Sequence, residues 1–218
     1  MAVRYVVFDW DGTLADTYPV IYAAYKYVFK TLGMKPITYD EIKKLTSSRD
    51  NKDTLGVVFG EKKELARKAY YDYIKAHHTD GLQAIPNAKK LLDFCRSSGV
   101  KNFLLTNKKR PYLLEELDYL GFSGYFSNIV AAGDLGEDKP DPKAVEALFD
   151  GNLPEADSVL VLGDGMADWK VSQVLNRAGK KSLCVIYDPQ KKFHEVSPDY
   201  KIADIADVIT ILKEKNNE

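Results

Sequence analysis

The stretch Tyr5-Val6-Val7-Phe8-Asp9-Trp10-Asp11-Gly12-Thr13 decides the fold, because four apolar residues lead directly into two closely spaced carboxylates. A short, continuous apolar run is typical of a buried β-strand. Carboxylates at the end of a buried strand lose hydration, and this is unfavourable unless other groups compensate. A divalent cation and a phosphoryl group would compensate, and one carboxylate would remain available as a nucleophile. Asp and Gly are also common in turns, so the rest of the chain must decide between the two interpretations.

The composition sets the class of protein. The chain has 218 residues, enough for one large domain or for a domain with a smaller insert. Its 45% apolar and 29% charged residues and its net charge of −1 give no reason to expect nucleic acid or a membrane as partner. Cys95 and Cys184 lie in separate apolar stretches and are expected to be reduced core thiols. Without a long apolar segment or a signal-peptide pattern, we expect a cytoplasmic protein.

Short apolar runs alternate with helical patterns from about residue 88 onward. The runs are continuous, as in strands that helices cover on both faces. Strands separated by helices predict a parallel sheet, and we therefore expect an α/β fold with a Rossmann-like core. Asp141 precedes Pro142 and is the expected N-cap of one helix. The expected strands are residues 5–8, 103–105, 129–131, 159–162 and 183–186, and the expected helices are residues 88–98, 111–120, 142–149 and 166–177.

The segment from about residue 17 to residue 80 has a different pattern. It is rich in Tyr, Lys and Ala at helical spacing and has no comparable strand-like run. We expect several helices that form a small inserted domain. The expected division is a core of residues 1–16 and 87–218 and a helical cap, with its linkers, of residues 17–86. We expect the tyrosines of this segment mainly to pack between helices, with one or two lining a substrate pocket.

Polar side chains follow four of the expected strands, at the point where each strand ends. In open α/β sheets this edge is where ligands bind. Carboxylates are hard oxygen ligands that suit Mg²⁺, a hydroxyl can donate to a phosphoryl oxygen, and an ammonium offsets negative charge. The residues concerned are, in chain order, Asp9, Asp11, Thr106, Asn107, Lys139, Asp164 and Asp168.

With these residues, the chain resembles the phosphatase branch of the haloacid dehalogenase superfamily. That pattern is Asp-x-Asp-Gly-Thr after a strand, Thr or Ser after a second strand, a Lys, and Gly-Asp-x-x-x-Asp. The chain has all four parts in that order, the last at residues 163–168. The resemblance covers nearly the whole chain, including an inserted helical cap. Thr106-Asn107-Lys108 is similar to phosphoglycolate phosphatase-like members, and Ser48-Arg49 is similar to a loop of β-phosphoglucomutase relatives.

The resemblance implies roles for the catalytic residues. Asp9 would be the nucleophile that forms an aspartyl phosphate. Asp11 would protonate the leaving group and then act as the base on water. Thr106 and Lys139 would be catalytic by positioning the phosphoryl group, and the backbone of Asn107 would help to bind it.

The resemblance also implies a Mg²⁺ site. Asp9, the backbone carbonyl of Asp11 and Asp164 would bind the ion, and Asp168 would bind through water or orient a neighbour. Gly165 stands where many relatives have Thr or Ser, so a side-chain contact is not expected there. Arg49 in the cap would meet the substrate or, as an alternative, would be a solvated loop residue.

The expected function is that of a Mg²⁺-dependent phosphatase acting on a small phosphorylated metabolite. The substrate would be phosphoglycolate-like or a sugar phosphate monoester, and the protein a monomer or a homodimer. One alternative is a phosphomutase of the β-phosphoglucomutase type, which Ser48-Arg49 supports. Another is a binding protein that keeps the fold without turnover. Lys108 is as readily a solvated lysine as part of the site, and His77 and His78 are expected to be exposed at a helix end.

Overall fold

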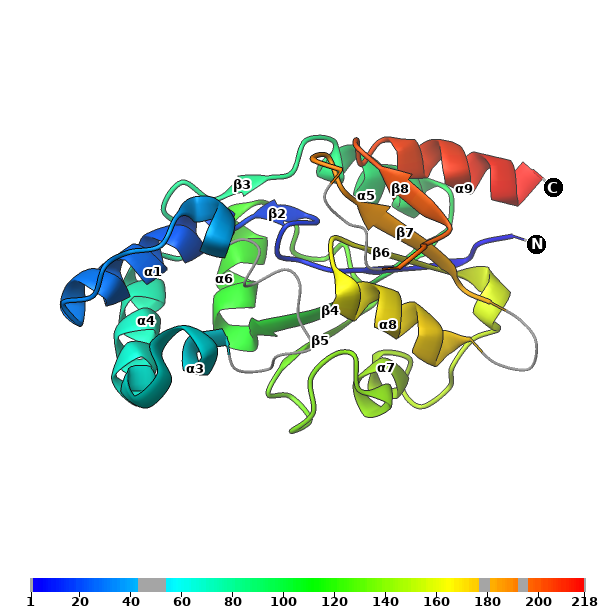
Figure 1. The fold of residues 1–218 in the computed structure, drawn as a ribbon. Coiled ribbons are helices and arrows are strands. Elements are labelled where there is room, and N and C mark those ends of the chain that lie inside the picture. Colours follow the sequence, from blue (N-terminus) through cyan, green and yellow to red (C-terminus); the bar gives the residue numbers. More distant parts are fainter. Residues whose placement is uncertain (1, 43–53, 177–180, 192–195, 218) are drawn as a thin grey trace.

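A computed structural model describes residues 2–42, 54–176, 181–191 and 196–217 of the chain. It shows a sheet between two layers of helices, with a further group of helices beside one end of the sheet (Figure 1). No helix within these ranges has the length and hydropathy that a membrane span requires. The predicted substrate contact Arg49 and its neighbour Ser48 lie outside the described residues.

The central sheet has six strands in the order β5-β4-β1-β6-β7-β8, and every neighbouring pair is parallel. The strand that precedes Asp9 lies near the middle, and its Tyr5 stands opposite Lys101 on one side and Val159 on the other. This confirms the predicted α/β fold, to which the structure adds β8. The strands are β1 (Tyr5–Phe8), β4 (Lys101–Lys109), β5 (Asn128–Ala132), β6 (Val159–Gly163), β7 (Leu183–Tyr187) and β8 (Tyr200–Ile202).

Helices cover both faces of the sheet, which explains why strands β1, β6 and β7 have no charged residue along their whole length. Val6 and Phe8 of β1 pack into the core beneath α5, α6 and α9, whereas Val7 packs into the core beneath α7 and α8. The Asp141 side chain accepts a hydrogen bond from Lys143 N at 2.9 Å, which confirms the predicted N-cap of α7. The helices are α5 (Ala88–Ser97), α6 (Arg110–Tyr119), α7 (Pro142–Leu148), α8 (Met166–Leu175) and α9 (Asp207–Asn217), and a 3₁₀ turn, η2 (Ala156–Ser158), precedes β6.

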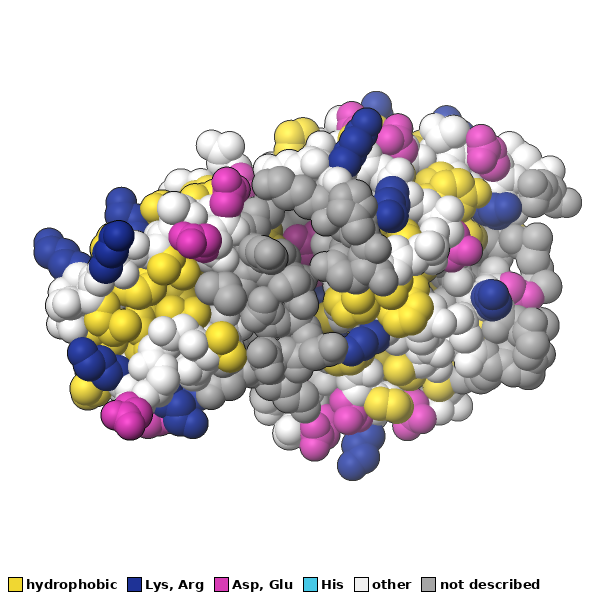
Figure 2. Space-filling model, in the orientation of Figure 1, with side chains coloured by type: hydrophobic (Ala, Val, Ile, Leu, Met, Phe, Trp, Pro, Cys, Tyr) yellow, Lys and Arg dark blue, Asp and Glu magenta, His cyan; other side chains and the backbone are white. Residues whose placement is uncertain are grey.

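Helices α1 (Tyr18–Thr31), α3 (Thr54–Phe59) and α4 (Lys63–His77) lie between β1 and β4 in the chain and beside the sheet in space (Figure 1). We call these three helices the helical insert. They share a hydrophobic core of their own, which includes Tyr25, Phe29 and Phe59, and the 3₁₀ turn η1 (Gly60–Lys62) joins α3 to α4. Figure 2 shows hydrophobic side chains on the outer surface of the insert, and interspersed basic and acidic side chains over the core.

The chain enters and leaves the helical insert through two short strands that pair with each other. Strand β2 (Ala15–Asp16) runs antiparallel to β3 (Gln83–Ala84), with Ala15 opposite Ala84. Leu14 O also accepts a hydrogen bond from Ile85 N at 2.9 Å. The two connections therefore form one paired link between the insert and the sheet, whereas the domain boundaries near residues 17 and 86 stay a prediction.

Candidate active site

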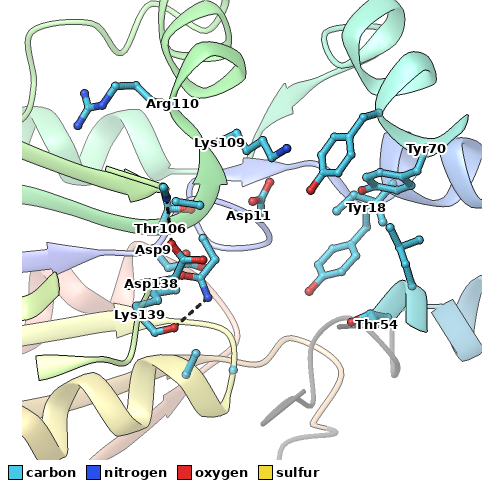
Figure 3. A pocket seen from close by; sticks show the side chains of 18 of the residues that line it. Asp9, Asp11, Tyr18, Thr54, Tyr70, Thr106, Lys109, Arg110, Asp138 and Lys139 are labelled. Carbon is cyan, nitrogen blue, oxygen red and sulfur yellow. Dashed lines mark hydrogen bonds and ion pairs between the residues drawn. The ribbon is translucent and has the colours of Figure 1, made fainter. Parts of the chain in front are cut away.

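A pocket of about 950 Å³ opens at the carboxyl edge of the sheet, where the sheet faces the helical insert (Figure 3). Every predicted site residue within the described part of the chain lines this pocket. The strand ends thus bring together side chains that are far apart in sequence, as the parallel topology requires. The residues are Asp9, Asp11, Thr106, Asn107, Lys139, Asp164 and Asp168.

Lys139 is the buried cation of the site. Its ammonium forms an ion pair with Asp9 Oδ1 and lies 2.8 Å from Asp168 Oδ1. All three side chains are at most 7% exposed, so water contributes little screening. Asp168 is held further by Gly165 N, which donates to its Oδ2 at 3.1 Å. The position of Lys139 is therefore set by one carboxylate that follows β1 and another in the first turn of helix α8.

The negatively charged carboxylates of the site repel one another. Burial raises the pKa of Asp9 well above its usual range, and the charges of Asp168 and Asp164 raise it further, whereas Lys139 lowers it. Burial disfavours the charged form of Lys139, but Asp168 and Asp9 outweigh this effect and raise the pKa of its ammonium. The site thus holds more negative charge than one ammonium balances, and an additional cation would stabilise it.

Asp9, Asp164 and Asp168 are suitably placed to hold a metal ion. Each offers a carboxylate oxygen, and these oxygens lie within 4.8 Å of one another. An all-oxygen donor set of this kind fits Mg²⁺, which binds a few carboxylates and keeps several waters. Among the described residues, the Asp11 side chain is not in this group, and the use of its backbone carbonyl stays a prediction.

The end of β4 supplies the predicted phosphate-binding groups. The Thr106 side chain is buried, and its Oγ1 accepts a hydrogen bond from Lys108 N at 3.1 Å. The Asn107 side chain donates to the backbone oxygen of Lys139 at 3.0 Å. Beyond the predicted backbone contact, Asn107 therefore also fixes the loop that carries Lys139.

Glycine is required at position 12 for two reasons: other side chains lie very close to it, and its backbone angle φ is positive. Its φ is +79°, and a Cβ atom at this position would lie 2.4 Å from Asp164 Oδ2 and 2.7 Å from Tyr18 Cε2. Such distances are well inside van der Waals contact, so the carboxylate of Asp164 would have to move. Because Gly12 has no side chain, the acidic segments that follow β1 and β6 can lie close together.

Gly12→Ala is expected to displace Asp164 and weaken Mg²⁺ binding as well as stability. The matched control is Gly124→Ala, because Gly124 has the same φ of +79° but open space where its Cβ would be. We expect Gly124→Ala to cost only the backbone strain, about 1–2 kcal/mol. Chemical denaturation and Mg²⁺ titration of both variants test this, and equal effects on Mg²⁺ affinity would contradict it.

Tyr18 is a site residue that the sequence analysis missed. It begins helix α1, and its hydroxyl donates a hydrogen bond to Asp164 Oδ2 at 2.9 Å. Burial and the charge of Asp164 raise the pKa of Tyr18 well above its usual range, which keeps it a donor. The helical insert therefore contacts the predicted metal site directly.

The structure decides between the two interpretations of Lys108 and corrects the expectation for His78. The Lys108 side chain is only 13% exposed, and its ammonium lies 2.9 Å from Asp11 Oδ1, which decides against a solvated lysine. His77 is exposed as predicted, but the prediction for His78 was wrong, because its side chain is only 5% exposed. His78 lies against Glu116 and Tyr112 of helix α6. These residues are far from His78 in the sequence, so the residues next to His78 give no sign of the contact.

The opposite wall of the pocket comes mainly from the helical insert. Tyr25, Tyr70 and Tyr71 line it, together with the basic side chains of Arg67 from α4 and Lys109 from β4. Figure 3 shows Tyr18 and Tyr70 across the pocket from Asp9 and Lys139. The pocket thus combines an acidic floor with an aromatic and basic wall.

Comparison with known proteins gives one consistent family. The haloacid dehalogenase-like hydrolase family matches residues 6–185. A pyrophosphatase of Oceanobacillus iheyensis is 27% identical over 97% of this chain and 98% of its own length. A phosphoglycolate phosphatase of Aquifex aeolicus is 26% identical over 96% of this chain and 97% of its own length.

Solved structures agree on the fold. A haloacid dehalogenase-like family hydrolase from Streptococcus pneumoniae superposes with a TM-score of 0.81, covers 96% of this chain and 98% of its own, and is 19% identical. The family match extends over the strand ends that carry Asp9, Thr106, Lys139 and Asp164. The sequence-based resemblance is therefore confirmed: the chain belongs to the haloacid dehalogenase-like hydrolase family and is a hydrolase of its phosphatase type.

Proposed function

We propose that the protein is a Mg²⁺-dependent phosphatase that hydrolyses a small phosphorylated metabolite through an aspartyl phosphate on Asp9. The observation that carries this proposal is the convergence of Asp9, Asp11, Thr106, Lys139 and a carboxylate triad in one pocket. When bound, Mg²⁺ would supply positive charge against the phosphoryl oxygens. We also propose a cytoplasmic location, which the two free, buried cysteines support.

The first step would transfer the phosphoryl group to the protein. An oxygen of Asp9 attacks phosphorus, the bond from phosphorus to the leaving oxygen breaks, and Asp11 gives its proton to that oxygen. Thr106 and Lys139 stabilise the negative charge on the phosphoryl oxygens. Lys139 is suited to this role because Asp9 and Asp168 already hold its ammonium beside the reacting group.

The second step would release phosphate. Asp11 takes a proton from water, the water oxygen attacks phosphorus, and the bond from phosphorus to Asp9 breaks. Closure of the helical insert would exclude other water during the first step. The side chains of Tyr18 and Tyr70 support this, because they reach the pocket from the insert (Figure 3).

The substrate would carry a second anionic group beyond the phosphate that is transferred. Arg67 and Lys109 place positive charge on the wall opposite the acidic floor, where the rest of a substrate would lie. The two relatives named above act on pyrophosphate and on phosphoglycolate, which both have such a group. The phosphomutase alternative depends on Ser48 and Arg49, outside the described residues, so no described contact favours it.

Phosphate release from a small panel tests this function. We expect the native protein with Mg²⁺ to hydrolyse phosphoglycolate or pyrophosphate, and to hydrolyse ethyl phosphate, which has no second anion, much more slowly. Chelation of Mg²⁺ should abolish release, and a Mg²⁺-dependent rise in the unfolding temperature should accompany activity. A folded, Mg²⁺-binding protein that releases no phosphate from any compound would overturn the proposal.

A further inference from the structure

A line of contacting polar side chains leads from Asp11, at the pocket, to the fully buried Glu116. Lys108 Nζ lies 2.9 Å from Asp11 Oδ1 and 2.8 Å from Glu116 Oε1. Burial disfavours the charged form of Lys108, but Asp11 and Glu116 outweigh this effect and raise the pKa of its ammonium. Lys108 is therefore a charged group held between two carboxylates, only one of which faces the substrate.

Glu116 is fixed from several sides. Its side chain is 0% exposed, although it belongs to the middle of helix α6. Trp10 Nε1 donates to its Oε2 at 2.7 Å, and His78 Nδ1 lies 3.2 Å from its Oε1. A carboxylate with this many partners has little freedom to rotate, so it fixes the position of the ammonium that it binds.

The line of contacts reaches the helical insert through His78. This residue follows the last turn of α4, and its Nε2 lies 2.9 Å from Glu115 Oε2 while its ring packs against Tyr112 at 5.2 Å. The end of α4 is thereby attached to helix α6 of the core. The contacts that support Asp11 thus include a residue at the point where the chain leaves the insert.

The contact with Lys108 limits what Asp11 can do with its two oxygens. Because Lys108 occupies Oδ1, the proton for a leaving group is most easily carried on the other oxygen, Oδ2. A carboxyl group that could rotate freely would present either oxygen and would often face away from the leaving group. Proton transfer needs the donor atom within hydrogen-bond reach of the leaving oxygen.

We propose that Lys108 is a positioning residue that holds Asp11 Oδ2 toward the leaving group, and that Glu116, fixed by Trp10 and His78, holds Lys108. This inference rests on the proposed role of Asp11 as the acid. It assigns to Lys108 a function distinct from that of Lys139. Lys139 forms an ion pair with Asp9, the other carboxylate after β1.

The test compares substrates with good and poor leaving groups. Para-nitrophenyl phosphate needs little help from an acid, whereas phenyl phosphate, nearly the same in size, needs much more. We expect Lys108→Met to lower kcat for phenyl phosphate about tenfold or more beyond its effect on para-nitrophenyl phosphate, with KM little changed. A merely structural loss would lower both rates by the same factor.

Further variants complete the experiment. Asp11→Asn is the reference and should show the largest leaving-group dependence, and Lys108→Met should add little to it in the double variant. Lys101→Met, an exposed lysine at the start of the same strand, should change neither rate. Glu116→Gln keeps Asp11 and Lys108 and should show a smaller leaving-group dependence, which decides the matter if Lys108→Met does not fold.

The outcomes separate the inference from the function on which it rests. If Asp11→Asn shows no leaving-group dependence, the proposed acid role of Asp11 fails. If Asp11→Asn shows it but Lys108→Met and Glu116→Gln lower both rates equally, Asp11 is the acid and Lys108 does not position it. The inference stands if Asp11→Asn, Glu116→Gln and, where it folds, Lys108→Met all shift the ratio of the two rates in the same direction.

Discussion

Asp9→Asn is expected to abolish phosphate release from every substrate, with a loss of at least about 10⁴-fold, because it removes the proposed nucleophile of the covalent intermediate. The amide keeps the shape of the carboxylate but lacks its charge and nucleophilicity. It can still meet Thr13, whose hydroxyl lies 3.4 Å from Asp9 Oδ2. Steady-state and single-turnover phosphate release measure this loss.

The fold should survive this substitution. Burial and the neighbouring carboxylates raise the pKa of Asp9, so its charge costs stability at neutral pH in the metal-free protein. We therefore expect Asp9→Asn to unfold at a temperature equal to or above that of the native protein without Mg²⁺, and to gain less from added Mg²⁺. Asp16→Asn, on β2 and outside the pocket, is the control and should stay active. Release by Asp9→Asn at a rate near the native one would exclude Asp9 as nucleophile.

Lys139→Met is expected to have the largest effect on stability, about 3–5 kcal/mol at neutral pH without Mg²⁺, because it leaves buried carboxylates without their cation. Asp9 and Asp168 each contact the Lys139 ammonium and are almost fully buried. Activity should be lost as well. Lys143→Met, an exposed lysine at the start of helix α7, is the control and should change stability very little.

The effect of Lys139→Met should depend on pH in a defined direction. Lys139 opposes the rise in the pKa of Asp9, so the variant raises that pKa further. A carboxyl group with a raised pKa in the folded state contributes stability that is present at low pH and lost as pH rises through that pKa. The destabilisation should therefore shrink in acid and grow toward neutral pH, and denaturant unfolding across this range measures it. A difference that is constant with pH, or no larger than that of Lys143→Met, would contradict this account.

The sequence could predict the sheet and the gathering of site residues because both depend on local signals. Apolar runs identified the strands, and the rule that ligands bind at the carboxyl edge placed Asp9, Thr106, Lys139 and Asp164 together. β8 was missed because Tyr200–Ile202 is short and has Lys201 at its centre. An edge strand with one exposed residue does not give the continuous apolar pattern of a central strand.

The surroundings of Asp11 could not be predicted in the same way. His78 and Glu116 are 38 residues apart, and each has polar neighbours that make it look like an exposed residue of its own helix. Their burial results from the contact of His78, which follows the end of α4, with helix α6, and helical periodicity does not report such a contact. The sequence does not decide between the two interpretations of Lys108 either, because its partners Asp11 and Glu116 come from different segments.

The pairing of β2 with β3 has a consequence for how such a chain can change over evolutionary time. Because the outgoing and returning strands lie side by side, with Asp16 opposite Gln83, the ends of the intervening segment are already neighbours. A segment with adjacent ends can be lengthened, shortened or exchanged without moving the residues that flank it. The proposed chemistry at Asp9 and the wall that the insert adds to the pocket are thus encoded in parts of the gene that can vary separately, joined through one antiparallel pair.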